Sequence, residues 1–153
     1  MQRGVDRSKI KIDITKYNNE NILLALETKK IIHLYSDNLQ SKVKVYSLEE
    51  IISEKIRALF QRTRPRDLYD VWYLWSRVDK GKVLNILPEK CRFKDVKINI
   101  NNLEGRKDNF KNAWNNSLNH QLKILPDFDN VFFAVVEELK KVYMKIIKTG
   151  RNI

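Results

Sequence analysis

Two amphipathic helix patterns, separated by a proline, constrain the fold of this chain more than any other feature. Ser47 and Glu50 have the spacing of a capping box, in which a hydroxyl and a carboxylate cap each other's backbone amides at a helix N-terminus. This first helix should end near Arg64, because the residue before a proline disfavours helical backbone, and Pro65 suits the first turn of a second helix over 65–78. Each helix has an apolar stripe at helical spacing: Leu48, Ile51, Ile52, Ile56, Leu59 and Phe60 on the first, and Leu68, Val71, Trp72, Leu74, Trp75 and Val78 on the second. We expect the two helices to pack as a helical corner.

The part of the chain before these helices has strand patterns instead. Apolar and polar residues alternate along 9–15 with the period of two expected of a half-buried strand, and Asp13 lies on its polar face. The β-branched residues at 31–32 favour a second strand within 22–35, and the valines in 43–45 suggest a short third strand. These three segments predict a small antiparallel sheet.

The rest of the chain is mostly helical in pattern. We expect a short helix over 81–87, a mixed stretch to about 102, a helix over 106–122 and a long helix over 127–148. The predicted fold class is therefore α+β, with a small N-terminal antiparallel sheet packed on a C-terminal helical bundle. We divide the chain into a β region, 1–46, and a helical domain, 47–153.

Composition excludes several classes of protein. No apolar run approaches the roughly 18 residues that a membrane span needs, and the N-terminus lacks a secretory signal, so we expect a cytoplasmic protein with no membrane partner. A single cysteine and two histidines make no zinc site. The net charge is +11, and five bases follow the last acid: Lys140, Lys141, Lys145, Lys148 and Arg151. Such a charge attracts RNA or DNA, although a solvated basic surface is an equal alternative.

Lys55 lies at an unusual place in the first helix. At about 100° per residue it falls between Ile52 and Leu59, inside the apolar stripe. Its ammonium group must either extend past the stripe to water or meet an anion, because burying an unpaired charge costs several kcal/mol.

Two acids, Asp67 and Asp70, lie one turn apart at the start of the second helix. Carboxylates there stabilise a helix N-terminus by about 0.3–1 kcal/mol each, and either could form a structural ion pair with Arg66 or with Lys55 across the corner. The alternative is a functional site, in which acids, lysine and arginines converge to hold a polyphosphate and its metal. The pattern alone leaves both open.

The stretch 45–59, Val-Tyr-Ser-Leu-Glu-Glu-Ile-Ile-Ser-Glu-Lys-Ile-Arg-Ala-Leu, together with Arg62 and the 66–72 segment Arg-Asp-Leu-Tyr-Asp-Val-Trp, closely resembles a family signature. It is that of the AbiEii/AbiGii abortive-infection toxin nucleotidyltransferases, in the polymerase-beta-like superfamily. The shared elements are a helix with Lys-x-x-x-Leu, a basic loop and a helix with Arg-Asp-x-x-Asp. The strand pattern at 9–15 is also similar to the strand that precedes this region in the family.

The resemblance implies an activity and its partners. Family members transfer a nucleotidyl group from an NTP in an active site with Mg²⁺, and some modify the acceptor end of tRNA as the toxin of a toxin–antitoxin pair. By the resemblance, the catalytic residues of this chain would be Lys55, Asp67 and Asp70, the substrate-binding residues Arg62 and Arg66, and a metal-binding residue Asp13. Lys55 would neutralise the NTP phosphates.

One departure from the family pattern bears on activity. The family has a Gly-Ser segment followed about ten residues later by Asp-x-Asp, which together hold the triphosphate and its metal ions. Here Gly4 is followed by Val5, and the nearby acids, Asp6 and Asp13, do not form an Asp-x-Asp. We therefore expect a C-terminal part of a family member that is weak or inactive alone. The alternative is a non-catalytic basic module that binds nucleic acid or a partner protein. We also expect self-association through an uncovered strand edge.

Overall fold

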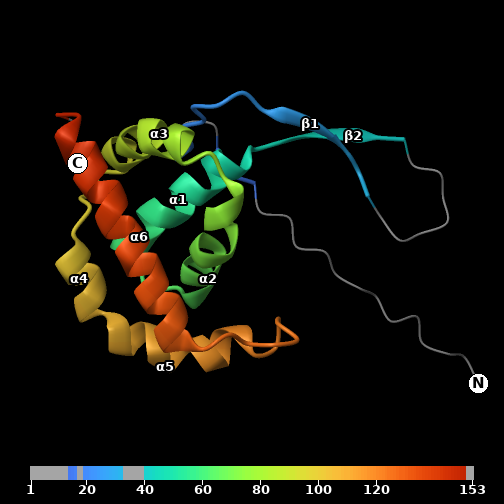
Figure 1. Cartoon of the computed structure of the whole chain (residues 1–153). Helices are drawn as coiled ribbons and strands as arrows, with labels where there is room; N and C mark the ends of the chain where they lie inside the picture. The colour runs from blue at the N-terminus through green and yellow to red at the C-terminus, as the bar shows by residue number, and fades with distance from the viewer. Residues whose placement is uncertain (1–13, 17–18, 33–39, 151–153) are drawn as a thin grey trace, which may run out of the picture.

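The computed structural model describes residues 14–16, 19–32 and 40–150 as a helical bundle from which a two-stranded hairpin projects (Figure 1). The elements, in chain order, are β1 (Glu27–Lys30), β2 (Lys42–Val45), α1 (Leu48–Gln61), α2 (Pro65–Leu74), the 3-10 helix η2 (Trp75–Arg77), α3 (Lys80–Phe93), α4 (Ile100–Gly105), α5 (Lys107–Leu118) and α6 (Phe128–Lys148). The α+β class is confirmed, and the described residues form a predominantly helical C-terminal part.

The predicted corner of two helices is confirmed, with small differences at its ends. Ser47 caps α1, and its Oγ accepts from the backbone amide of Glu50 at 3.1 Å. The Glu50 carboxylate does not follow the expected reciprocal pattern, because it accepts from the amides of Leu23 and Leu24 instead. The first helix ends three residues before Arg64, and α2 passes into the 3-10 turn at Trp75.

Helix α3 is longer than the sequence predicted. We expected a helix over 81–87 followed by a mixed stretch, but α3 continues through Pro88 to Phe93. A proline inside a helix costs about 3 kcal/mol, since it removes a backbone hydrogen bond and crowds the preceding turn. The helix continues because Val83, Leu87 and Cys91 are completely buried, and burial of such side chains gives roughly 1.5–3 kcal/mol each.

Of the two remaining helix predictions, one is confirmed and the other is only partly right. The long helix over 127–148 is confirmed as α6, which Asp127 caps. The helix predicted over 106–122 is confirmed in part, because α5 starts at Lys107 but ends at Leu118. A separate helix that was not predicted, α4, precedes it at Ile100–Gly105. Among the described residues no helix is both long enough and apolar enough to cross a membrane.

The sheet has two described strands, and the strand prediction was only partly right. β1 and β2 pair antiparallel, with Lys29 opposite Val43, and β2 confirms the strand expected around the valines. β1 lies before the β-branched pair at 31–32. The strand predicted over 9–15 lies mostly outside the described residues, and its described end, at 14–15, is not in a strand. The β1 and β2 side chains are exposed apart from Val45, which is half-buried, so the hairpin buries little against the bundle.

The core lies between α1 and the helices around it. α1 packs against α2, α3 and α4, and Ile52, Ile56 and Leu59 of its predicted stripe are completely buried. Leu48, at the start of the same stripe, is exposed. An aromatic group from α5 and α6 fills the opposite side of the bundle: Phe110, Trp114, Phe128 and Phe132. The helical bundle is thus organised around one central helix.

Arg106, between α4 and α5, ties the end of α1 to the rest of the bundle. Its guanidinium donates to the Leu59 carbonyl oxygen at 2.5 Å and to Thr63 Oγ1 at 3.3 Å. Carbonyls in the last turn of a helix have no partner within the helix, so this contact satisfies one of them. Burial lowers the pKa of Arg106 below the usual arginine value.

We predict that Arg106→Met lowers the free energy of unfolding by roughly 1–3 kcal/mol, because the Leu59 carbonyl would then be left without its charged donor. Urea denaturation followed by circular dichroism measures this change. Arg92→Met is the control, since Arg92 is exposed and its one ion pair among the described residues is with its helical neighbour Glu89. Equal stability of the two variants would contradict the prediction.

Candidate functional site

Lys55 of α1 and the two acids of α2 meet at the corner between these helices. Lys55 Nζ lies 3.0 Å from Asp67 Oδ1 and 2.7 Å from Asp70 Oδ2. Arg62, just after α1, donates from Nε to Asp67 Oδ2 at 2.8 Å. The sequence had predicted Lys55 inside the apolar stripe of the first helix, and the loop of three residues between α1 and α2 brings the acids within its reach. We call these four residues the ionic corner.

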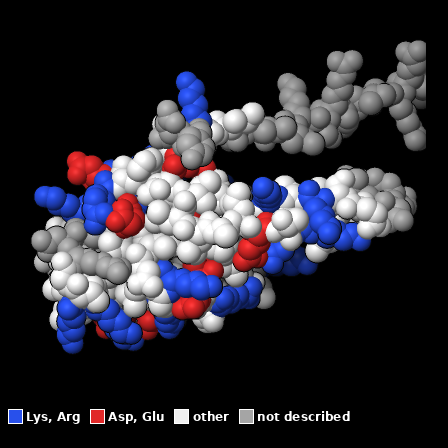
Figure 2. All heavy atoms as spheres, turned by 90° about the horizontal axis from the view of Figure 1, so that it is seen from above, with Lys and Arg blue, Asp and Glu red and all other residues white. Residues whose placement is uncertain are grey.

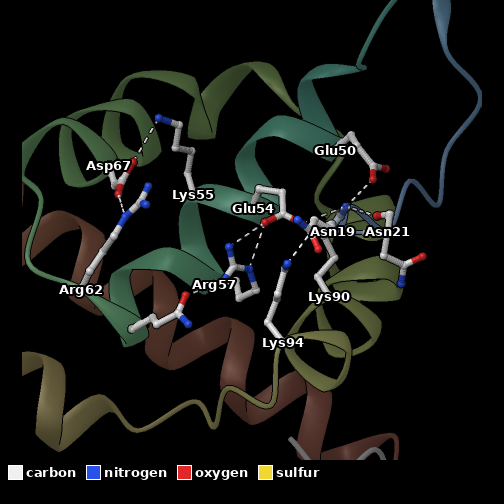
Figure 3. Close-up of polar contacts among 11 residues, drawn as sticks. Asn19, Asn21, Glu50, Glu54, Lys55, Arg57, Arg62, Asp67, Lys90 and Lys94 are labelled. Atoms are coloured by element: carbon white, nitrogen blue, oxygen red, sulfur yellow. Dashed lines mark hydrogen bonds and ion pairs between the residues drawn. The ribbon is translucent and has the colours of Figure 1, made fainter. Parts of the chain in front are cut away.

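The two carboxylates of the ionic corner have different surroundings. Asp67 has a side-chain exposure of 3%, and Figure 3 shows Lys55 and Arg62 approaching its two oxygens from different sides. Asp70 is 35% exposed and contacts only Lys55 among the described residues. Asp67 is buried and each of its oxygens already accepts from a cation, so Asp70 is the more accessible acid.

The lysine of the corner remains charged. Burial alone lowers the pKa of Lys55, but hydrogen bonds and charge attraction from Asp70 and Asp67 outweigh it, so the pKa is raised above the usual value. The lysine's contribution to stability is therefore complete below the usual lysine pKa and is lost only as the pH rises through the raised value. At neutral pH the corner holds two cations and two anions.

The remaining predicted site residues are not part of the corner. Arg66 is exposed and makes no hydrogen bond or ion pair with the described residues. Asp13, the predicted metal-binding residue, lies outside the residues that the structure describes. The structure therefore brings together four of the six predicted site residues.

A second ionic group, which the sequence analysis missed, lies on another face of α1. Lys90 of α3 has a side-chain exposure of 2%, and its Nζ contacts the Glu50 carboxylate and lies 3.1 Å from Glu54 Oε1. It also donates to the Asn21 carbonyl oxygen at 2.5 Å. Arg57 pairs with Glu54 from the same helix, at 2.9 Å (Figure 3). We call Lys90, Glu50 and Glu54 the buried lysine cluster.

This cluster holds the segment that precedes the hairpin. Both Glu50 oxygens accept backbone amides of Leu23 and Leu24 at 3.1 Å, and Lys94 donates to the Asn19 carbonyl oxygen at 2.6 Å. Two spacings in the sequence could have revealed the buried lysine cluster. Glu50, Glu54 and Arg57 recur at helical intervals, and Lys90 lies one turn after the buried Leu87. The sequence analysis missed the cluster because it predicted a shorter helix, and only the longer α3 places Lys90 beside α1.

A polar cavity of about 440 Å³ lies beside both groups. Its lining combines the segment before the hairpin with α1 and α3: Thr15, Asn19, Glu20, Asn21, Ile22, Tyr46, Glu50, Glu54, Arg57, Arg62, Lys90 and Lys94. Arg62 belongs both to this lining and to the ionic corner, whereas Lys55, Asp67 and Asp70 do not line the cavity. The cavity has the size and the polar groups to admit a charged small molecule.

The described residues do not by themselves fit a Mg²⁺ ion. They contain no group of three or more acidic, histidine or cysteine side chains placed to hold a metal. Within the ionic corner, the Lys55 ammonium already bonds to both carboxylates. Magnesium prefers six oxygen ligands at short range, so two carboxylates neutralised by a lysine are a poor site.

Comparison with known proteins tests the resemblance. No curated protein and no solved structure matches the chain. A family model described as "Nucleotidyl transferase AbiEii toxin, Type IV TA system" matches residues 1–134, which include the ionic corner, the buried lysine cluster and the first turns of α6. Because the match covers most of the sequence, the chain belongs to the AbiEii family of nucleotidyl transferase toxins from type IV toxin–antitoxin systems.

Proposed function

We propose that this chain takes part in the transfer of a nucleoside monophosphate from an NTP to an RNA such as tRNA. The observation that carries this proposal is the ionic corner, where two cations and an accessible carboxylate meet beside a polar cavity. The family implies an NTP substrate and an antitoxin partner. Cations at such a site neutralise the phosphate charge that develops as the acceptor oxygen bonds to phosphorus and pyrophosphate leaves.

The corner residues have separate roles in this proposal. Arg62, with 43% of its side chain exposed and a place in the cavity lining, is the cation most open to a triphosphate. Lys55 reaches phosphate by exchanging its contact with Asp70, the more exposed of its two acids. Asp67 is a positioning residue, since it is buried and orients both cations. Arg66, Asp13 and Mg²⁺ remain predicted contributors to the site. The division of the chain at residue 46 also remains a prediction.

We expect the 153-residue chain alone to transfer nucleotides weakly or not at all. The N-terminal part of the sequence lacks the family's Gly-Ser and Asp-x-Asp segment, and the described residues do not make a metal site. Loss of a single electrostatic element of this kind typically costs orders of magnitude in rate. The second candidate function, a non-catalytic basic module, is favoured by one observation: Lys55 and Arg62 are already paired with carboxylates.

We predict that Lys55→Met weakens NTP binding roughly tenfold or more without unfolding the chain, because a charged hydrogen bond contributes about 1.5–3 kcal/mol. Isothermal titration with each of the four NTPs in the presence of Mg²⁺ measures the affinity, and thermal denaturation monitors the fold. Lys111→Met is the control, since Lys111 is exposed and pairs with Asp129 far from the corner in sequence. Unchanged affinity in Lys55→Met would favour the binding module.

We predict that Asp67→Asn loses stability as well as affinity. The substitution removes the charge that holds both Lys55 and Arg62, and we expect the free energy of unfolding to fall by roughly 1–3 kcal/mol. Asp70→Asn should keep most of the stability, because Asp70 is only partly buried and Lys55 retains Asp67. Urea unfolding of both variants separates the roles. Equal destabilisation would show that we have assigned the two acids wrongly.

Self-association, as predicted from the sequence, should depend on salt. β1 and β2 together contain four lysines and one glutamate, so two hairpins pairing edge to edge would bring like charges together. Salt screens this repulsion over about 10 Å at 0.1 M, and we therefore expect dimers to increase with ionic strength. Sedimentation velocity at low and high salt tests this. A monomer under all conditions and at high protein concentration would rule the association out.

A further inference from the structure

We propose that three lysines on one face of the hairpin, Lys30, Lys42 and Lys44, bind the phosphodiester backbone of RNA. We call this surface the lysine face. The inference deepens the proposed function, on which it rests, by assigning a surface to the acceptor. It concerns the exposed hairpin and not the ionic corner, so the two can be tested separately.

The strand register places these lysines together. Lys30 is directly opposite Lys42, and Lys44 is directly opposite Thr28. Directly opposed side chains of an antiparallel pair point to the same face, and residues two apart on one strand share that face. The three ammonium groups and the Thr28 hydroxyl therefore form one surface. The other face presents Glu27, Lys29 and two valines.

The lysine face has no counter-charge among the described residues. Its three lysines are exposed, and none forms an ion pair there. Lys29, on the other face, pairs with Glu27 at 2.6 Å. Some lysines of the helical bundle are paired too: Lys107 and Lys111 with Asp129, and Lys140 with Glu104. Figure 2 shows basic side chains gathered over the hairpin, where few acidic ones are visible.

This arrangement is unfavourable unless an anion is present. Like charges directly opposite each other destabilise an antiparallel pair, and Lys30 and Lys42 are such a pair. A two-stranded hairpin is only marginally stable in water, and this one buries little against the bundle. A bound polyanion would remove the repulsion and hold both strands.

The chemistry of the surface favours nucleic acid over protein. Protein–protein interfaces are poor in lysine and bury an apolar centre, whereas the lysine face has only lysines and a threonine. Lysine ammonium groups are point charges that bind phosphates without reading sequence, and a threonine hydroxyl can donate to a phosphate oxygen. The surface therefore fits a sugar–phosphate backbone.

The base of the hairpin also lies beside the cavity. Tyr46, the residue after β2, lines the cavity and donates its hydroxyl hydrogen to Glu20. On the other side of the hairpin, Leu23 and Leu24 are held by Glu50, which lines the same cavity. An RNA lying along the lysine face would therefore be led toward the cavity and Arg62.

The test compares two triple variants by fluorescence anisotropy with labelled single-stranded RNA over a range of KCl concentrations. Lys30→Gln/Lys42→Gln/Lys44→Gln removes the lysine face. Lys80→Gln/Lys107→Gln/Lys111→Gln is the matched control, because it removes the same charge from lysines that already have carboxylate partners. Circular dichroism checks that both variants fold.

We expect the hairpin variant to lower the slope of log affinity against log salt by about 2, since each phosphate contact to a single strand contributes about 0.7. The same relation gives roughly 100-fold weaker binding at about 0.1 M salt. The control should bind RNA within a few-fold of the unaltered chain. Single-stranded DNA should lose affinity with the hairpin variant too, because the contacts are to phosphates.

Three outcomes would overturn the proposal: unchanged RNA affinity and slope in the hairpin variant, an equal loss in the control, or a loss of polyglutamate binding with RNA binding intact. The last would assign the lysine face to an acidic protein. NTP titration of the same samples separates this inference from the proposed function. RNA loss with normal NTP binding supports the lysine face, and it does so even if Lys55→Met proves to have no effect on NTPs.

Discussion

A buried carboxylate, Asp67, fixes the corner on which the rest of the site depends. Its side chain is almost completely buried, yet both oxygens are occupied by cations from α1 and from the residue that follows it. Leaving such a buried group without a partner typically costs about 1–3 kcal/mol. The angle between α1 and α2 is therefore held by charge as well as by apolar packing, and the placement of Lys55 and Arg62 follows from it.

α1 distributes its charged side chains over two faces that do different things. Lys55 turns toward α2, while Glu50, Glu54 and Arg57 turn toward α3 and the segment before the hairpin. The buried lysine cluster joins three parts of the chain that are distant in sequence, and Glu50 gives up the expected capping role to bind that segment. One helix thus positions both the ionic corner and the base of the hairpin.

The sequence could predict the corner because everything it needs is local. The capping serine, the apolar stripe and Pro65 define two helices with a loop of three residues between them, and Lys55 within the stripe must then meet α2. Lys90 could not be placed in the same way. Its contact with Glu50 depends on α3 continuing past Pro88, and only tertiary burial of Leu87 and Cys91 decides that. The strand register could not be predicted from the sequence either, because the hairpin has few apolar side chains to fix it.

The contrast between paired and unpaired cations suggests how the molecule divides its work. In the ionic corner each cation already has a carboxylate, so a phosphate group binds there only by replacing an existing contact, and binding depends on exact geometry more than on net attraction. The three lysines of the lysine face have no such partner among the described residues, and their field extends into solvent. Unpaired exposed charges mainly raise the rate of encounter and make it depend on salt. In the proposed function, an RNA would bind the hairpin first. Discrimination would follow at the ionic corner, where a phosphate group must bind Lys55 more favourably than Asp70 does.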